Sequence, residues 1–290
     1  NMPGVEVVEI ATAEDTSTRL YHLESQTDVV ITGKNQTLRD GNANQSFATI
    51  RIDGVEDEEL TVTLDNTARF DGELWINNLT VLDSDPRPLH TLNVVSNGIR
   101  DTSNVIASLV APTVSDASLN LLGTQDLAIR VNQLGATTPV KVDASQLKGQ
   151  LTLALDPGRG SVPPVLNNGW RDVVMGTEGN NDRLQLWGEQ VESQNTRISG
   201  FEIIQFGGAV VGGRVEQARG VFNAENVRGV NEIWNIRPSA DLGIIHLSTH
   251  EDGHAPLLGL RTIGGGIKTG IVYAAGQRVT EQNVIAEDVG

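Results

Sequence analysis

Residues 91–98 read TLNVVSNG, and the same arrangement returns as SLNLLG at 118–123, LAIRV at 127–131 and QLTLAL at 150–155. Each piece is a short apolar run followed by Asn, Asp, Gly or Thr, which are residues that favour turns. The runs recur at intervals of roughly 10–15 residues with no long helical pattern between them, which is typical of an all-β protein.

Similar runs lie on both sides of this regular region, and FATIRID at 47–53 alternates cleanly between apolar and polar residues. That alternation predicts Ala48, Ile50 and Ile52 on one face of a strand and Thr49, Arg51 and Asp53 on the other. Aromatic residues make up only 4% of the chain. Small aliphatic side chains suit thin, repeating coils, so we expect a parallel β-solenoid, with β-sandwich domains as the alternative.

The segment DPGRGSVPPVLNNG at 156–169 is rich in proline and glycine. This composition predicts a linker at 157–169 between two β-rich or solenoid regions, 1–156 and 170–290. Near the N-terminus, residues 14–23 suggest one or two turns of helix, and the acidic group EDEE at 56–59 predicts a turn.

The composition restricts the partners of the chain. Its net charge is −16 and its pI about 4.6, which argues against nucleic acid because phosphate binding needs clustered Lys and Arg. No run of 18 apolar residues is present, so no membrane span is predicted. The chain has no cysteine, which fits an exported bacterial surface protein.

Several segments resemble a known family. TLNVVSNG and SLNLLGTQDLAI, together with GTEGNNDRLQLWG at 176–188 and ISGFEIIQFGG at 198–208, are similar to repeats of bacterial surface-layer (S-layer) proteins and large RTX-like calcium-dependent adhesins. The resemblance covers residues 91–236. It implies a β-solenoid, export to the cell surface, self-assembly into a lattice or fibre, and calcium dependence.

The chain departs from the tandem GGxGxDx calcium repeat of that family, since only Gly179, Asn180 and Asp182 remain in a single copy. The loop at 178–182 nevertheless carries oxygen-bearing side chains, and calcium takes six to eight oxygen ligands. We therefore name Glu178, Asn180 and Asp182 as candidate calcium ligands. The alternative is an Asn/Gly-rich turn that caps its own backbone.

The sequence HLSTHEDGH at 246–254 contains a formal match to the H-E-x-x-H zinc-protease motif. That mechanism needs both histidines on one helical face, whereas Asp252-Gly253 and Pro256 favour a turn after the apolar run IIHL. We predict an exposed turn here, and name no catalytic or cofactor-binding residue.

Taken together, these features predict a structural extracellular protein of the bacterial cell surface, not an enzyme. We expect it to assemble with copies of itself into a surface layer, fibre or biofilm matrix, aided by calcium, with a cell-surface polysaccharide as a second partner. The alternatives are an adhesin binding domain and a polysaccharide lyase or hydrolase on a β-helix.

Overall fold

The computed structural model describes residues 5–12, 17–23, 27–33, 48–66, 74–83, 88–99, 103–111, 118–133, 141–155, 172–175, 181–188 and 197–288. The regular elements in these residues are all strands, and no helix long and apolar enough to cross a membrane occurs among them. The all-β prediction is confirmed.

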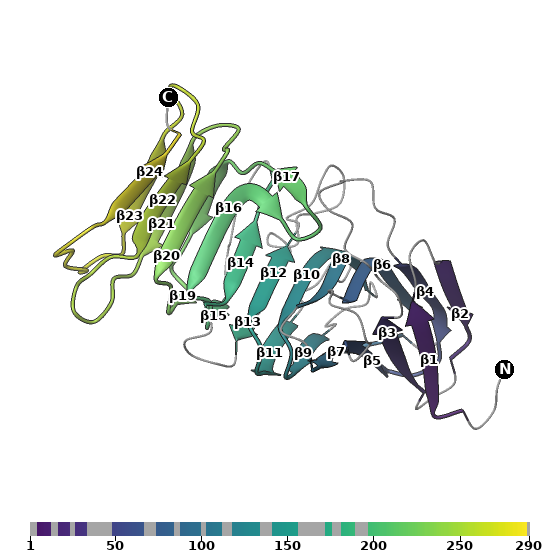
Figure 1. The fold of residues 1–290 in the computed structure, drawn as a ribbon. Helices are drawn as coiled ribbons and strands as arrows, with labels where there is room; N and C mark the ends of the chain where they lie inside the picture. The colour runs from purple at the N-terminus through teal and green to yellow at the C-terminus, as the bar shows by residue number, and fades with distance from the viewer. Residues whose placement is uncertain are drawn as a thin grey trace.

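The strands form three sheets (Figure 1). The first sheet has the order β1 (Val7–Thr12), β3 (Asp28–Gly33), β5 (Glu59–Asn66), β7 (Thr91–Gly98), β9 (Ser118–Gly123), β11 (Lys141–Leu147), β13 (Asp172–Met175), β15 (Arg197–Ser199), β19 (Val227–Arg228).

The second sheet faces the first and runs β2 (Ser17–Tyr21), β4 (Ala48–Val55), β6 (Leu74–Asp83), β8 (Asn104–Val110), β10 (Leu127–Gln133), β12 (Leu151–Leu155), β14 (Arg183–Leu186), β16 (Ile203–Val210), β20 (Glu232–Ile236), β22 (Leu257–Arg261), β24 (Val284–Glu287). Strand β17 (Arg214–Glu216) pairs with β16. A third sheet contains β18 (Gly220–Asn223), β21 (Leu242–Leu247) and β23 (Thr269–Tyr273).

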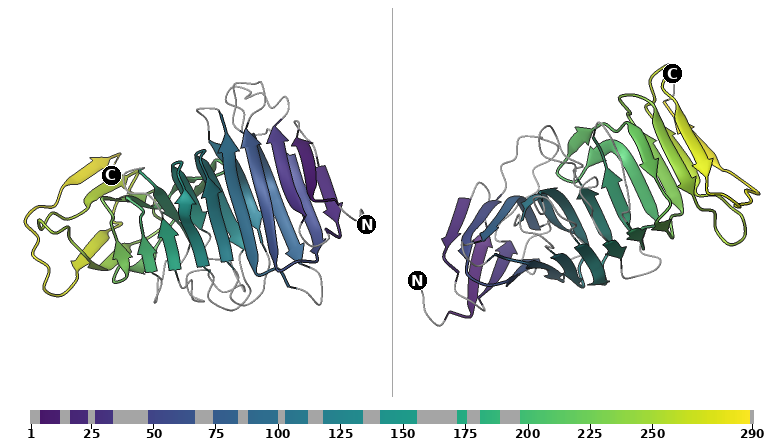
Figure 2. Two further views of the ribbon diagram at one scale, coloured as in Figure 1. Left: turned by 90° about the horizontal axis from the view of Figure 1, so that it is seen from below. Right: turned by 180° about the vertical axis from the view of Figure 1, so that it is seen from behind.

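Successive strands alternate between the first and second sheets as far as β16, so each coil of the chain adds one strand to each sheet. Neighbouring strands are parallel except for β16 and β17. The result is an elongated stack of coils with the two termini at opposite ends (Figure 2). This is the parallel β-solenoid that the sequence favoured over β-sandwich domains.

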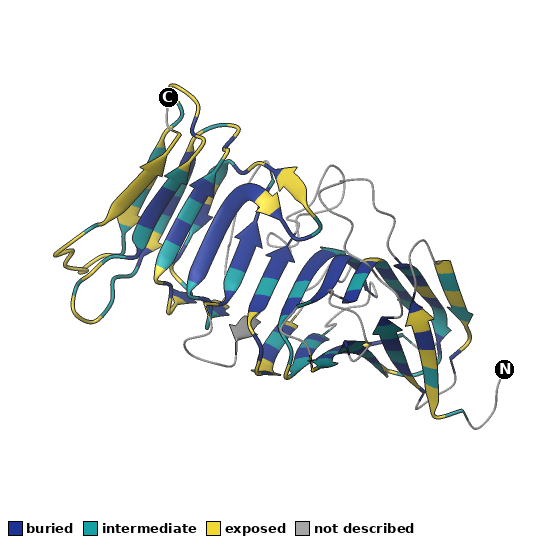
Figure 3. Ribbon diagram, in the orientation of Figure 1, coloured by how far each residue is buried: buried dark blue, intermediate teal, exposed yellow. Residues whose placement is uncertain are grey.

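Aliphatic side chains repeat at the same place in successive coils and fill the space between the sheets. In the first sheet the register pairs Leu60 with Leu92, Leu92 with Leu119, and Leu119 with Val142, all buried. The strand at Ala48–Val55 has the predicted alternation, since Ala48, Ile50 and Ile52 are inward. Burial is therefore continuous along the middle of the stack (Figure 3).

The structure corrects one local prediction and leaves another outside its range. Residues 17–21 form strand β2 and not a helical turn, because they pair with β4 from Ser17 opposite Thr49 to Tyr21 opposite Asp53. The predicted linker 157–169 lies outside the described residues. Strand β11 pairs with β13, and β12 with β14, on its two sides.

Part of the outer face of the second sheet is covered by the chain itself. Strand β16 bends and turns back into β17, forming a hairpin over the neighbouring coils (Figure 1). Gly207 allows the bend, since its φ is 67° and a Cβ there would lie 2.6 Å from the carbonyl oxygen of Ile236. A second apolar cluster lies at this face, formed by Val105, Ala154, Trp187, Val210 and Val211, with Trp75 and Ala128 packed against them.

A buried ion pair joins this hairpin to the sheet. Arg130 on β10 contacts Glu216 on β17, with Nη2 and Oε1 3.2 Å apart and both side chains almost fully buried. The Arg130 guanidinium also lies 4.6 Å from the ring centroid of Trp187, and its Nε donates to Oδ1 of Asn132 at 2.8 Å. Removing one member of a buried pair leaves the other charge in a poorly solvated place.

We therefore expect Glu216→Ala to lower the free energy of unfolding by about 3–5 kcal/mol, whereas the double substitution Arg130→Met/Glu216→Leu regains most of the loss. Urea denaturation of each variant measures this. Glu225→Ala, at an exposed position beyond β18, is the control and changes stability by less than about 0.5 kcal/mol. A double variant as unstable as Glu216→Ala would contradict this account of the pair.

Candidate functional site

A polar residue precedes each of four neighbouring strands of the second sheet. Asp126 precedes β10, Gln150 precedes β12, Asp182 precedes β14 and Glu202 precedes β16. Because the strands are parallel and in register, these residues stack at one corner of successive coils. We call the three carboxylates, Asp126, Asp182 and Glu202, the acidic column.

Each carboxylate of the acidic column accepts a hydrogen bond from a backbone N–H of a neighbouring coil. Asp126 Oδ1 accepts from the amide of Gln150 at 2.8 Å, and Asp182 Oδ1 accepts from the amide of Leu151 at 2.7 Å. Glu202 Oε2 accepts from the amide of Asp182 at 2.8 Å. The acids thus accept hydrogen bonds from backbone N–H groups at the corner. These N–H groups would be costly to bury without partners.

Asp182 is the most constrained member of the acidic column. It is fully buried, and its second carboxylate oxygen, Oδ2, has no hydrogen-bond partner among the described residues. Burial raises the pKa of Asp182 to about 6, against the hydrogen bond from Leu151, and the negative charges of Glu202 and Asp126 add to the increase. An unoccupied oxygen with this pKa can take up a proton or a cation near neutral pH.

The structure places one of the three predicted calcium ligands. Asp182 is described, whereas Glu178 and Asn180 lie outside the described residues. Within the part of the chain that the structure describes, no three His, Asp or Glu side chains gather closely enough to hold a metal ion. Sequence reasoning missed Asp126 and Glu202 as neighbours of Asp182, although all three stand immediately before a strand.

The histidine-rich segment forms the predicted turn after β21. The amide of Gly253 donates to the carbonyl of His250, and the amide of His254 donates to the Asp252 side chain at 2.9 Å. His254 lies 3.8 Å from Glu281 on the next coil. His250 and His254 therefore stand on a turn and not on a helical face.

Residues 56–58 of the acidic group connect β4 to β5 as the predicted turn, whereas the fourth, Glu59, belongs to strand β5. The Glu58 amide donates to Asp57 Oδ1 at 2.8 Å, and β5 then begins at Glu59. The Glu59 carboxylate accepts from the side-chain amide of Asn93 on the next coil at 2.6 Å. At least one of these acids therefore contributes to stacking of the coils.

Comparison of the chain with protein-family models, with curated proteins and with solved structures found no match.

We expect Asp182→Asn to stabilise the protein at neutral pH. The folded state holds the Asp182 proton more tightly than the unfolded state does, because the pKa of this carboxyl group is near 3.8 in an unfolded chain. Its contribution to stability is therefore complete below about pH 4, falls as the pH rises through about 6, and stays low above that. The pKa difference corresponds to about 3 kcal/mol of unfolding free energy that is lost when Asp182 ionises. The Asp182→Asn protein avoids this loss because its amide carries no charge.

Chemical denaturation of both proteins from pH 4 to pH 8 measures the effect. The matched control is Asp241→Asn, because exposed Asp241 also accepts a backbone amide from the next coil, that of Lys268 at 2.7 Å. If Asp182→Asn and the unsubstituted protein lose stability in parallel between pH 4 and 7, the buried charge of Asp182 is not the cause.

Proposed function

We propose that this protein is a structural component of the bacterial cell surface that assembles with copies of itself into a layer, fibre or biofilm matrix. The observation that carries the proposal is the pair of long parallel sheets that extend through the stack of coils. At a strand spacing of about 4.8 Å, the second sheet alone is roughly 50 Å long. Such a body presents extended, repetitive faces suited to contact with other copies.

The outer face of the first sheet supports a scaffold role. Asn93 donates to Glu59 at 2.6 Å, and Asn120 donates to Asn93 at 2.8 Å, so a ladder of side-chain hydrogen bonds joins β5, β7 and β9. Lys141 and Asp143 form an ion pair on the next strand at 2.6 Å. These polar groups are occupied with one another, which stiffens the coils.

We propose that copies associate through the last described strands. Strand β24 pairs with β22 and with no second strand among the described residues, and all four of its residues are exposed (Figure 3). Val284 and Ile285 on β24 are 54% and 41% exposed. An exposed apolar strand edge is a template for pairing with another chain.

We expect the net charge of −16 to hold copies apart at low ionic strength, and salt to permit assembly, because the Debye length falls to ~8 Å at physiological ionic strength. Light scattering and electron microscopy across a sodium chloride series test this. Sheets or filaments that dissolve on dilution are the expected result. A protein that stays monomeric at every ionic strength would contradict self-assembly.

Two substitutions test whether β24 forms the contact between copies. Ile285→Lys puts a charge on β24, which we expect to raise the concentration needed for assembly about tenfold or more, since edge lysines block strand pairing. Val215→Lys is the matched control, because Val215 is 55% exposed on the hairpin strand β17. Equal effects of the two substitutions would remove β24 from the contact while leaving self-assembly intact.

Calcium is the cation that we propose for the loop at 178–182, with Glu178, Asn180 and Asp182 as ligands. The support from the geometry is Oδ2 of Asp182, which has no hydrogen-bond partner in the described part of the chain. Millimolar calcium should raise the melting temperature of the unsubstituted protein and have a smaller effect on Asp182→Asn, with magnesium as the comparison ion. No shift in melting by calcium would remove the cation from the proposal.

A further inference from the structure

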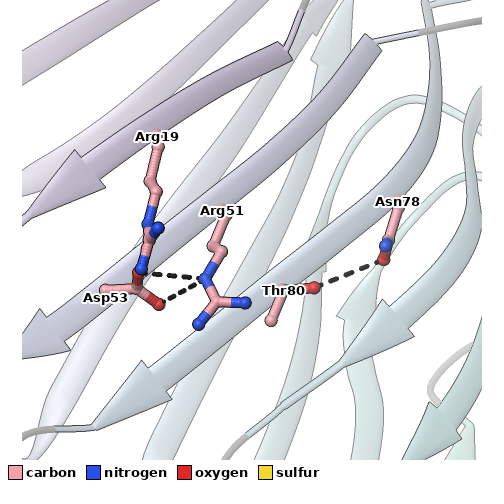
Figure 4. A network of polar contacts seen from close by, with 5 residues as sticks. All are labelled: Arg19, Arg51, Asp53, Asn78 and Thr80. Atoms are coloured by element: carbon pink, nitrogen blue, oxygen red, sulfur yellow. Dashed lines mark hydrogen bonds and ion pairs between the residues drawn. The ribbon is translucent and has the colours of Figure 1, made fainter.

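The fold brings two arginines together on the outer face of the second sheet. Arg19 on β2 is paired in register with Arg51 on β4, and both side chains contact the carboxylate of Asp53 (Figure 4). Arg51 Nε lies 2.7 Å from Asp53 Oδ1 and 2.9 Å from Oδ2, and Arg19 Nε lies 2.5 Å from Oδ2. We call Arg19, Tyr21, Arg51 and Asp53 the arginine patch.

This placement is unfavourable for stability alone, since like charges opposite each other on neighbouring strands repel. Partial desolvation would raise the pKa of Asp53, but the hydrogen bonds and charges of Arg19 and Arg51 outweigh it and lower that pKa. Asp53 therefore stays ionised and holds both guanidinium groups. Two positive charges and one negative charge leave the patch positive on a chain whose net charge is −16.

The arginine patch keeps binding groups available to solvent. Among the described residues, Arg51 bonds the Asp53 carboxylate through Nε, and its two terminal nitrogens form no hydrogen bond to that carboxylate (Figure 4). The side chains of Arg19 and Arg51 are 47% and 45% exposed. A planar guanidinium with free N–H groups is suited to a carboxylate, which it can bind through two parallel hydrogen bonds.

An aromatic ring belongs to the same patch. Tyr21 is 56% exposed, and the guanidinium of Arg19 lies 4.4 Å from its ring centroid. The Arg19 side chain is thus held both by the ring and by Asp53. A fixed arginine loses less conformational entropy when it binds an anion.

Hydroxyl and amide groups continue from the patch along the stack. Thr80 Oγ1 and Ser108 Oγ each donate to Asn78 Oδ1 at 3.4 Å, and Asn132 Nδ2 donates to Ser108 Oγ at 2.6 Å. These side chains repeat from β6 to β10, one coil after another, and are only partly buried. Their hydroxyl protons are used in these bonds, but the hydroxyl oxygens and the remaining amide hydrogens of Asn78 and Asn132 can still bond a long polar ligand that lies across the strands.

We propose that the arginine patch and this polar row bind an acidic polysaccharide, with Arg19 and Arg51 contacting the carboxylates of its uronic-acid units. The row of hydroxyl and amide groups matches the many hydroxyls of a sugar chain, and Tyr21 offers a face for a sugar ring. An acidic peptide fits less well, because protein contacts depend on side chains buried in well-packed pockets, and the side chains of the patch are exposed and mostly polar. This site does not depend on self-assembly.

Calorimetry at pH 7 and low salt, with EDTA to remove calcium, tests the site with polygalacturonate as the probe. We expect binding that weakens as sodium chloride is added. Arg51→Gln should weaken it about tenfold through loss of a charged hydrogen-bonding group, and Tyr21→Ala several-fold. Melting curves recorded on the same samples establish that each variant is folded.

The matched control is Arg261→Gln at the other end of the same sheet. Arg261 also bonds a carboxylate, that of Glu287 at 2.6 Å, and lies 5.3 Å from the ring of Trp234. The Arg261→Gln protein should bind polygalacturonate as the unsubstituted protein does. The proposal would be overturned if the unsubstituted protein did not bind polygalacturonate, or if both arginine variants lost binding. It would also be overturned if polyglutamate or neutral dextran bound as well as polygalacturonate does.

Discussion

Parallel register between successive coils is the constraint on which the rest of the structure depends. Once Leu92 lies opposite Leu119 and Leu119 opposite Val142, side chains of one kind are forced into columns along the stack. Inward columns become an aliphatic core, whereas outward columns bring like polar groups together. The same constraint therefore produces the asparagine ladder, the paired arginines and the acidic column.

The acidic residues consequently have two different roles in one fold. Asp126 and Glu202 serve as acceptors for backbone amides at a corner of the coils. Asp182 does the same but is fully buried, and one of its oxygens has no partner among the described residues, so its ionisation opposes folding. A residue that costs stability at neutral pH in an otherwise regular stack is a sign of function, which is why this corner, and not the exposed acidic turns, is our candidate cation site.

The sequence predicted those features whose cause is local. SLNLLG and LAIRV coincide with β9 and β10 because alternating apolar residues and turn-forming residues define a strand within a few positions. Strand β2 was missed because STRLY is specified by pairing with β4 and not by its own composition. The acidic column and the arginine patch join residues 20 to 34 positions apart. Because the coils differ in length, no regular repeat in the sequence reveals which of these residues become neighbours.

The hairpin formed by β16 and β17 has a mechanical consequence. Force applied along the axis of the stack would load the hydrogen bonds between two neighbouring coils directly, and a plain solenoid would peel apart one coil at a time. Glu216, however, reaches Arg130 across 86 residues of sequence, and Gly212 lies against Ala107 on β8. The hairpin thus fastens β16 to coils that are not its immediate neighbours, so several coils must separate together and the middle of the rod should resist tension better than its ends.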